Sequence, residues 1–548
     1  MTAPFSPLWT DASSELRKTG TWRAALPEYS NIVSPCRQAC PVGGRIAEWV
    51  GQIGAGDIEG AWTTLVDNNP FPSIAGRICH HPCETSCNRV ELDETVSICA
   101  LERFAGDQAL SEGWAFPAPP KERDDSVAII GGGPAGLSAA YQLRRLGFVV
   151  HLYEASDQLG GLLRYGVPAY RLDKAVLDQE INRIVAMGVH LHLGTEISDA
   201  AALKALRGEH GAVFLASGAS RPKALPGIDY GKSYVIDSAN YLAETNAGRE
   251  GSMGHHLVVI GGGSAAMDVA RTARRLGRQV SVLSLEPDHL LPAQRAEVDE
   301  AKEEGVTFIS GAMLQNLQEG PGGLTLECVK VDFKPGAKRG AFSVEPLADS
   351  SFTLAADLVV PAIGQDVDLA RWATALTANG PLLGADRHWR TSMEGVFVGG
   401  DAASMDRFVT EAIGMGKEAA LAIAAFIDGK LAKPAGGAKI AGFDTINTAY
   451  HPRAARHLPE HAAPAARLKS FGEVQYRLSA DAALDEAKRC FSCGTCTYCD
   501  NCYFYCPDMA ITRLGDGYEV NADYCKGCGL CVAECPTGSV RMQEDVSS

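Results

Sequence analysis

The sequence predicts an α/β protein with two nested Rossmann-type nucleotide-binding domains, a helical N-terminal domain and a small α+β C-terminal domain. Two glycine-rich turns, each between an apolar strand and a helical segment, predict the nucleotide-binding domains. Most of the 17 cysteines gather near the two ends of the chain in short, regular spacings, which predicts metal sites in the flanking domains. A chain of 548 residues is long enough for three or four domains with separate cores.

Composition narrows the class of partner and the compartment. The chain has 66 acidic and 50 basic residues, a formal net charge of −16 and no basic run, so nucleic acid and anionic membranes are poor candidate partners. The N-terminus lacks the apolar segment of a secretory signal, and no apolar run approaches the roughly 20 residues of a membrane span. We therefore expect a cytoplasmic protein whose cysteines bind metal clusters and do not form disulfides.

The first glycine-rich turn follows the strand SVAII and precedes the helical segment LSAAYQLRRLG. Gly131 permits the tight turn, Gly133 lets a pyrophosphate approach the backbone, and Gly136 allows the helix to pack closely on the strand. The next strand, VVHLY, ends at Glu154, where a carboxylate can bind a ribose hydroxyl. Strand, turn, helix and carboxylate together predict a dinucleotide site.

The second turn, in LVVIGGGSAAMD, repeats this order with Gly261, Gly263 and Ala266, and a small residue suffices at the third position. The strand VSVLSL follows, and Glu286 takes the place of the ribose-binding carboxylate. The alternative interpretation is a degenerate Rossmann unit that is kept for packing.

A later segment, GVFVGGDAA, places Gly400 and Asp401 after another apolar strand and ahead of a helical segment. An Asp there can hydrogen-bond the ribityl or phosphate region of a flavin, and the helix N-terminus favours a pyrophosphate. A plain Asp turn is the alternative. If this segment completes the first nucleotide-binding domain, the second is inserted within the first.

The last tenth of the chain contains the run C-x2-C-x2-C-x3-C-P twice, which is typical of a bacterial ferredoxin domain with two [4Fe–4S] clusters. The fourth cysteine of each run is expected to ligate the other cluster. Zinc is the alternative metal, but nothing in its four-ligand chemistry needs the duplicated Cys-Pro ending. Cys490 and Cys493 lie just upstream and stay undecided between structural thiols and an unusual cluster environment. The predicted ligand sets are Cys496, Cys499, Cys502 and Cys535 for one cluster, and Cys506, Cys525, Cys528 and Cys531 for the other.

Together these motifs resemble those of the glutamate synthase small subunit and its relatives, over roughly residues 30–450. The resemblance is carried by the N-terminal cysteines, GGGPAG, EASDQLGGLLRYGVPAYRL, GGGSAAMD and GVFVGGD. It implies a flavin oxidoreductase whose first Rossmann domain binds FAD and whose inserted domain binds NAD(P)H. The residues implied to face FAD are Gly131, Gly133, Pro134, Ala135, Gly136, Glu154, Gly160, Gly161, Gly400 and Asp401, and those implied to face the nicotinamide nucleotide are Gly261, Gly263, Ser264, Ala265, Ala266 and Glu286.

The resemblance also implies [4Fe–4S] chemistry at the N-terminal cysteines. Fuller members of the family carry two more cysteines ahead of Cys36, which this chain lacks. Six thiols cannot supply the roughly eight that two all-cysteine clusters need, so we predict one cluster there, and a second only with unusual ligands. The alternative for these N-terminal cysteines is that they are buried free thiols. His80 and His81 are expected in exposed or supporting positions. The isolated Cys328 is expected to be a core thiol. The predicted ligands are Cys40, Cys79 and Cys83, with Cys36, Cys87, Cys99 or Glu102 to complete the set.

One departure from the family predicts the nucleotide preference. NADPH-using members carry arginines just after the second strand of the inserted domain, where this chain reads LSLEPDH. The Glu286 carboxylate would accept a hydrogen bond from a 2′-hydroxyl and repel a 2′-phosphate. We therefore predict NAD(H), not NADP(H).

These motifs predict an electron-transfer protein in which NAD(H) exchanges a hydride with FAD and iron–sulfur clusters pass single electrons. No general base or nucleophile is nominated, because the cofactors carry the chemistry. The fused ferredoxin domain resembles a module that accompanies ferredoxin-type 2-oxoacid oxidoreductases, so the catalytic subunits of such a thiamine-diphosphate enzyme are the expected partner. An NADPH-dependent glutamate synthase small subunit, a stand-alone NADH:ferredoxin oxidoreductase and a non-catalytic assembly module are the alternatives.

The expected domain order follows from these assignments. A helical iron–sulfur domain occupies residues 1–124, the FAD domain 125–250 and 363–430, the NAD domain 251–362, a connection with a flexible start 431–480, and the ferredoxin domain 481–548, entered through the helical segment SADAALDEAKRC.

Overall fold

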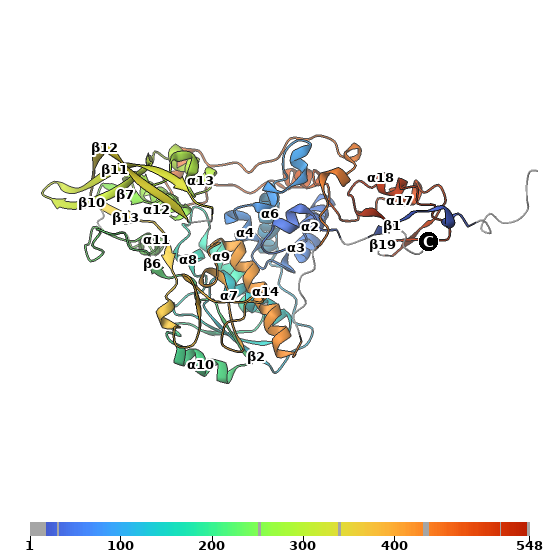
Figure 1. Cartoon of the computed structure of the whole chain (residues 1–548), viewed down its shortest axis with the longest axis horizontal. Coiled ribbons are helices and arrows are strands. Elements are labelled where there is room, and N and C mark those ends of the chain that lie inside the picture. Colours follow the sequence, from blue (N-terminus) through green and yellow to red (C-terminus); the bar gives the residue numbers. More distant parts are fainter. Residues whose placement is uncertain are drawn as a thin grey trace, which may run out of the picture.

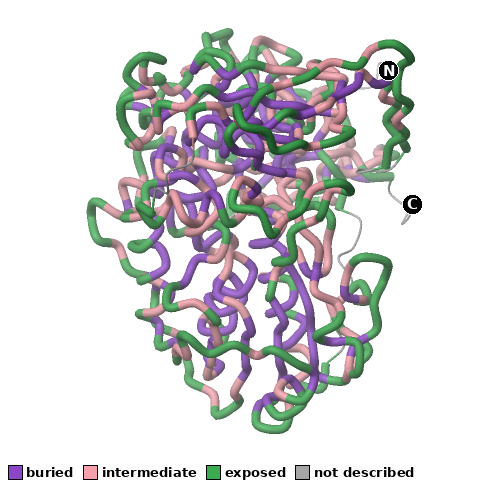
Figure 2. The backbone as a smooth tube through the Cα atoms, turned by 90° about the vertical axis from the view of Figure 1, so that its left-hand side faces the viewer, coloured by how far each residue is buried: buried purple, intermediate pink, exposed green. Residues whose placement is uncertain are grey.

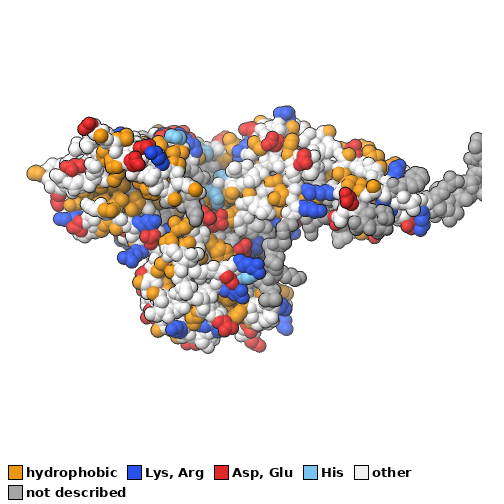
Figure 3. Space-filling view, in the orientation of Figure 1, with side chains coloured by type: hydrophobic (Ala, Val, Ile, Leu, Met, Phe, Trp, Pro, Cys, Tyr) orange, Lys and Arg blue, Asp and Glu red, His pale blue; other side chains and the backbone are white. Residues whose placement is uncertain are grey.

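The computed structural model describes residues 18–29, 32–249, 254–337, 341–430, 438–515 and 517–544. Figure 1 shows the second nucleotide-binding fold at one end, the C-terminal domain at the other, the N-terminal helices between them and the first nucleotide-binding fold below. Basic and acidic side chains are interspersed on the face that Figure 3 shows. No helix within these ranges is long and apolar enough to cross a bilayer. The flexible start expected for the connection falls mostly outside them.

A parallel five-stranded sheet forms the first nucleotide-binding fold, in the order β17-β5-β2-β3-β4. Its strands are short apolar runs, as expected of a sheet that helices cover on its faces. Strand β17 comes from the late glycine-aspartate segment, so the chain returns to this sheet after building the second fold. The elements are β2 (Ser126–Ile130), α7 (Pro134–Arg145), β3 (Val149–Tyr153), α8 (Leu162–Tyr165), α9 (Lys174–Val185), β4 (Val189–His192), α10 (Ala200–Glu209), β5 (Ala212–Leu215), β17 (Val396–Val398) and α14 (Val409–Ile427).

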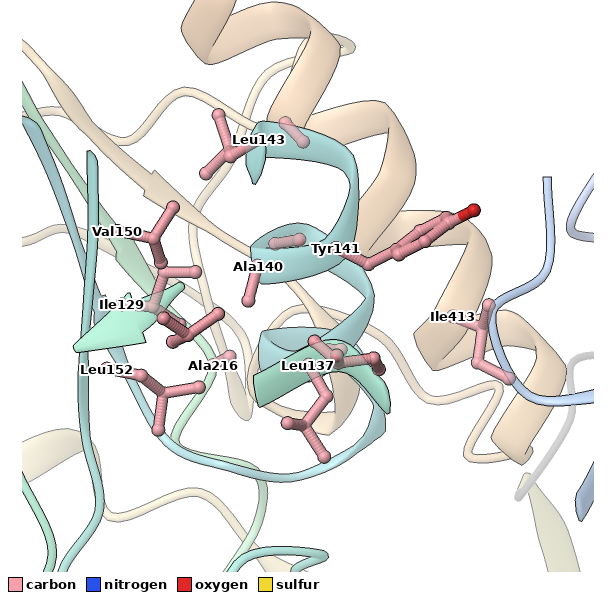
Figure 4. Packing of buried hydrophobic residues seen from close by; sticks show 14 of the residues in the cluster. Ile129, Leu137, Ala140, Tyr141, Leu143, Val150, Leu152, Ala216 and Ile413 are labelled. Carbon is pink, nitrogen blue, oxygen red and sulfur yellow. The ribbon is translucent and has the colours of Figure 1, made fainter. Parts of the chain in front are cut away.

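Helices α7, α9 and α14 pack on one face of this sheet, and Figure 4 shows Ile129 and Leu152 turned toward Leu137 of α7. Buried residues lie in the interior of the fold and exposed residues in its outer loops (Figure 2). Helix α14 approaches α7 so closely that a Cβ on Gly416 would lie 2.2 Å from the carbonyl oxygen of Ala135. This close packing holds the late segment against the start of α7.

The second fold has a four-stranded parallel sheet in the order β13-β7-β8-β9, with α12 on one face. An antiparallel sheet, β10-β11-β12, covers the other face and was not predicted from the sequence. Cys328 is fully buried between the two sheets, as expected of a core thiol. The two connections to the first fold pair with each other as β6 (Arg221–Pro222) and β14 (Gln365–Asp366). The other elements are α11 (Ser238–Asn246), β7 (His256–Ile260), α12 (Ser264–Arg275), β8 (Gln279–Ser284), α13 (Arg295–Glu303), β9 (Thr307–Ser310), β10 (Ala312–Gly320), β11 (Gly323–Pro335), β12 (Phe342–Ala356) and β13 (Leu358–Pro361).

The N-terminal helices enclose an apolar core that also includes a helix from near the other end of the chain. Helix α16 (Ala480–Lys488), expected to lead into the ferredoxin domain, instead inserts Ala483 and Ala487 into this core. It approaches α2 closely, because a Cβ on Gly54 would lie 3.5 Å from the backbone nitrogen of Lys488. The helices are α1 (Pro35–Ala39), α2 (Ile46–Gly54), α3 (Ile58–Val66), α4 (Pro72–Ile78), α5 (Pro82–Thr85) and α6 (Ile98–Glu112).

The C-terminal domain also borrows from the opposite end of the chain. Strand β1 (Ala25–Tyr29), within the segment assigned to the helical domain, pairs antiparallel with β20 (Val540–Glu544). The ring of Tyr29 stacks on that of Tyr518 with centroids 5.7 Å apart. The remaining elements are α17 (Asn501–Phe504), β18 (Ile511–Leu514), β19 (Gly517–Val520) and α18 (Leu530–Ala533).

The connection ahead of α16 runs over the second fold and the N-terminal helices. His461 and Arg467 pair with the carboxylates of Glu300 and Glu303 in α13, at 2.9 and 2.8 Å. Farther on, Glu473 pairs with Arg103 of α6 at 2.7 Å. The connection therefore fastens the second fold to the helical domain.

Candidate functional site

Each nucleotide-binding fold presents the N-terminus of a long helix at its glycine-rich turn. Helices α7 and α12 follow Gly133 and Gly263, and neither residue has a side chain that could cap the first amide groups. Those amides and the helix dipole favour a pyrophosphate. A Cβ on Gly263 would meet nothing within 4 Å, and one on Gly133 would meet only Gly161 at 3.9 Å, so both turns are open to a ligand. The predicted residues Pro134, Ala135, Ser264 and Ala265 form the first turns of these helices.

The first glycine of each turn is required by its backbone. Gly131 and Gly261 have φ of +107° and +138°, and a Cβ would lie 2.3 and 2.4 Å from the carbonyl oxygens of Ala216 and Ala362. At the third position a Cβ on Gly136 would lie 1.9 Å from the oxygen of Gly131, whereas the second fold accommodates Ala266 there.

The two predicted carboxylates occupy equivalent places. Glu154 accepts hydrogen bonds from the backbone N–H groups of Gly132 at 2.7 Å and Ser156 at 2.9 Å. A Cβ on Gly132 would lie 3.1 Å from Oε2 of Glu154, and one on Gly262 would lie 3.1 Å from Oε2 of Glu286. Burial raises the pKa of Glu286. The second fold therefore keeps the geometry of a nucleotide site, not only its packing.

A cavity of about 290 Å³ opens beside Glu154, at the carboxyl ends of the first sheet's strands, and Gly131 and Tyr153 are among its lining residues. Ligands of doubly wound sheets bind at this edge. The turn at Gly400 (φ +67°) brings Asp401 there, and burial raises the pKa of Asp401. Gly160 and Gly161, with φ of +122° and +52°, approach the turn at Gly133, where a Cβ on Gly161 would lie 3.0 Å from Cα. Gly161 thus lies against Gly133 and Gly400 against Ala135, and the open turn at Gly133 fits a flavin dinucleotide.

The C-terminal cysteines are arranged as two crossed sets. The first set, Cys496, Cys499, Cys502 and Cys535, lines a cavity of about 20 Å³. In the second set, burial raises the pKa of Cys525, and the neighbouring thiols Cys506 and Cys528 raise it further. Cys531 is likewise close to Cys525 and Cys528, which add to the effect of burial on its pKa. The structure therefore gathers the first predicted set around one cavity, and it places Cys525 of the second set near Cys506, Cys528 and Cys531, with Cys531 also close to Cys502 of the first set.

The N-terminal cysteines divide between two cavities. Cys40, Cys79 and Cys83 line one of about 30 Å³ together with Glu102. Burial raises the pKa of Glu102 to about 7, and Nδ2 of Asn69 donates a hydrogen bond to Oε1 of Glu102 at 2.8 Å. Glu102 is therefore the candidate that lies in place to complete the predicted set.

The other candidates are placed differently. Cys99 lies beside this group, because Cys79, Glu102 and Cys83 add to the effect of burial in raising its pKa. Its thiol donates to the carbonyl oxygen of Ala75 at 3.4 Å and does not line the cavity. Cys36 and Cys87 line a separate cavity, together with Cys490 and Cys493. The role of Cys490 and Cys493 was left open from the sequence, and their grouping with Cys36 and Cys87 was not predicted, although the register Cys490-x2-Cys493-x2-Cys496 was a signal for it.

The histidines occupy supporting positions. His80 stacks on Phe408 with centroids 3.9 Å apart, and His81 precedes α5. Within the described ranges, no three His, Cys, Asp or Glu side chains converge closely enough to hold a single metal ion.

Residues 125–422 match the sequence profile of the pyridine nucleotide-disulphide oxidoreductases. Residues 30–114 match the profile of dihydropyrimidine dehydrogenase domain II, 4Fe-4S cluster, and residues 518–541 that of a 4Fe-4S binding domain. With the sheet topology, these matches confirm the predicted fold class, with 4Fe-4S domains at both ends.

Three relatives show how far the similarity extends. The chain is 34% identical over 448 residues to NADPH-Fe(3+) oxidoreductase subunit beta of Geobacter sulfurreducens, covering 75% of this chain and 66% of that one, just under two thirds of its length. It is 32% identical over 428 residues to the glutamate synthase [NADPH] small chain of Azospirillum brasilense, and the match covers 73% of this chain and 87% of that one. It is 32% identical over 423 residues to the NAD-dependent dihydropyrimidine dehydrogenase subunit PreT of Escherichia coli, covering 76% and 97%.

Proposed function

The chain belongs to the pyridine nucleotide-disulphide oxidoreductase family, and from this premise we propose that it is the electron-transfer subunit of a larger oxidoreductase. It would exchange a hydride between NAD(H) and FAD, and single electrons with a partner through its iron–sulfur clusters. The observation that carries this proposal is the contact between a cysteine cavity and the first nucleotide-binding fold, in a chain that also has exposed cysteines in its C-terminal domain.

The cavity lined by Cys40, Cys79 and Cys83 lies against α14, the helix that completes the flavin fold. The thiol of Cys79 lies 3.7 Å from the hydroxyl of Thr410, in the first turn of α14. The same helix packs on α7, whose first turn forms the pyrophosphate cradle. Bound FAD would take two electrons as a hydride and release them one at a time. This adjacency supports direct electron exchange between the flavin fold and the N-terminal cluster.

We propose NAD(H) as the nucleotide because the ribose edge of the second fold is acidic. Glu286 would lie next to the 2′ group of the bound ribose, and Asp288 lies two positions farther along the chain. Arg295, the first arginine after Glu286 in the sequence, already pairs with Asp288 at 3.3 Å and Asp299 at 2.8 Å. The relatives above carry names with either nucleotide, so the preference is proposed from these side chains.

The partner would meet the C-terminal domain. The thiols of Cys499 and Cys528 are exposed, which puts both cluster sites near the surface. Phe504 and Met509, in the same domain, are 71% and 88% exposed, and exposed apolar side chains are typical of docking faces. The specific partner that we propose, from the resemblance of this domain, is the catalytic part of a ferredoxin-type 2-oxoacid oxidoreductase.

Anaerobic purification followed by titration with NADH and then NADPH tests the core of the proposal. We expect flavin and iron–sulfur absorbance that NADH bleaches much faster than NADPH. Protein without flavin absorbance would refute the assignment, and faster bleaching by NADPH would return the chain to the glutamate synthase type. Isolation of the complex from the native host, with an assay of 2-oxoacid-dependent NAD⁺ reduction, tests the partner.

A further inference from the structure

We propose that Cys36, Cys87, Cys490 and Cys493 ligate a further [4Fe–4S] cluster, which joins the N-terminal domain to the C-terminal domain. The first two thiols come from α1 and the end of α5, and the other two from the chain just after α16. They are separated by about four hundred positions and meet only in the folded protein. The inference adds a site to the proposed function, but its test does not depend on NAD(H) chemistry.

The four thiols line one small cavity. Its volume is about 20 Å³, similar to that of the cavity lined by the first predicted ferredoxin set. The rest of its lining is mainly apolar and includes Ile46 and Val50 of α2. A closed apolar pocket of this kind excludes water from a cubane and controls its potential.

The four thiols belong to one group in space. Cys36, Cys87, Cys490 and Cys493 all line the same cavity, and none of them forms a disulfide. Cys36 and Cys493 are buried, and Cys87 and Cys490 are half-buried. Iron bound there would compensate the charge of the four thiolates.

Amide groups already donate to two of the sulfurs. The backbone N–H of Ser492 donates to Sγ of Cys490 at 3.4 Å, and Nδ2 of Asn88 donates to Sγ of Cys493 at 3.5 Å. Hydrogen bonds of this type orient cluster ligands and tune the reduction potential. These donors would therefore serve an iron-bound thiolate.

A buried ionic network fixes the two halves of the site against each other. Arg89, which is 1% exposed, donates to the carbonyl oxygen of Arg489 and to the carboxylate of Asp93, both at 2.7 Å. Arg489 donates to Asp93 at 3.1 Å. Because Arg89 lies two positions after Cys87 and Arg489 one before Cys490, this network holds the thiols in register without the metal.

The proposal also resolves the count of N-terminal thiols. Six cysteines were too few for two all-cysteine clusters. The two C-terminal thiols complete one such site, and Glu102 completes the other with Cys40, Cys79 and Cys83. Each N-terminal cavity then has four candidate ligands.

The site lies between the others along the chain of cofactors. Cys36 and Cys40 are four positions apart around α1, a rise of about 6 Å along a helix. Cys493 and Cys496 are three positions apart, so their Cα atoms are separated by at most about 11 Å. A cluster here would connect the N-terminal cluster, which touches the flavin fold, with the ferredoxin clusters.

Metal analysis of the anaerobically purified full-length chain is the first test. Four clusters predict about 16 iron atoms and as many sulfides per chain, whereas three predict about 12. The double variant C490S/C493S should lose about four of each, and C36S should lose the same amount from the other side of the site. C328S, at a thiol remote from every cluster site, is the matched control and should lose none.

The outcomes separate this proposal from the proposed function. In C490S/C493S we expect NADH to bleach the flavin as in the wild type, while reduction of the ferredoxin clusters slows at least tenfold. An iron count of about 12 in the wild type, or equal iron in C490S/C493S and C328S, would overturn the proposal. Loss of one zinc instead of iron would overturn it as well. Absence of flavin would refute the proposed function and leave the iron count per chain decisive.

Discussion

Replacing Gly416 by alanine should separate α14 from α7 and weaken flavin binding. The new Cβ would lie 2.2 Å from the carbonyl oxygen of Ala135 and 3.0 Å from Cβ of Ser138. Normal contacts begin near 3.5 Å, so the helices must move apart by about 1 Å. Overpacking costs about 1–3 kcal/mol, and removing a glycine from a helix interior returns at most about 1 kcal/mol. With that return subtracted in full, we expect a net loss of up to about 2 kcal/mol in the free energy of unfolding.

The same movement should reach the flavin site. Gly400 packs on Ala135 in the first turn of α7, where a Cβ on Gly400 would lie 3.1 Å from Cβ of Ala135. The hydroxyl of Ser138 donates to the carbonyl oxygen of Ile413 at 2.7 Å, and this bond would lengthen. Displacing α14 therefore moves the Gly400–Asp401 turn relative to the pyrophosphate cradle. We expect fewer flavins per chain after purification.

The assay combines denaturant unfolding of the holoprotein with flavin content per chain. Gly208→Ala is the matched control, because Gly208 lies within α10 and a Cβ there would meet nothing within 4 Å. This control should be neutral or slightly more stable than the wild type, by up to about 1 kcal/mol. If Gly416→Ala matched Gly208→Ala in stability and kept its full flavin content, close packing of α7 and α14 would not be what holds the site together.

Three further perturbations test separate parts of the structure. Glu286→Arg should shift the ratio of kcat/KM for NADPH over NADH at least tenfold toward NADPH, because it replaces a charge that repels the 2′-phosphate by one that attracts it. An unchanged ratio in anaerobic flavin reduction would contradict the NAD(H) proposal. Burial raises the pKa of the Glu180 carboxyl to about 8 in the folded protein. Because the folded state holds this proton more tightly than the unfolded state does, the protonated carboxyl stabilises the fold below about pH 4.5, and this stabilisation is lost as the pH rises toward 8. The free energy of unfolding of the wild type relative to Glu180→Gln should therefore fall by up to about 4 kcal/mol between pH 5 and 8, and a pH-independent difference would refute this explanation. Arg89→Ala removes a fully buried guanidinium and leaves the partly buried carboxylate of Asp93 with Arg489 as a remaining partner. It should cost about 3 kcal/mol, whereas Arg249→Ala, which removes an exposed ion pair, should cost less than about 1 kcal/mol. Similar losses in these two variants would show that the buried network contributes little.

Much of the site was predictable because its geometry is local. A glycine-rich turn needs Gly131 and Gly261 for backbone reasons that lie within a few residues, and a helix that starts at the turn creates the anion site by itself. The crossed ferredoxin sets were also predictable, since their spacing reflects a compact repeated unit. The antiparallel sheet β10-β11-β12 was not predicted, because its outer strands β10 and β12 are largely exposed, and only the central strand β11 shows an alternation of buried and exposed residues.

Local sequence was enough to predict two dinucleotide folds, cysteine clusters at both ends of the chain and an acidic residue after the second strand of each fold. These features depend on residues that are close together in the sequence, so residue type and spacing are enough to predict them. Only the tertiary structure decided which distant thiols share a cavity, that β1 completes the C-terminal sheet and that α16 belongs to the N-terminal core. Such contacts join segments hundreds of residues apart, and their pairing is set by the burial of apolar surface and charge in three dimensions.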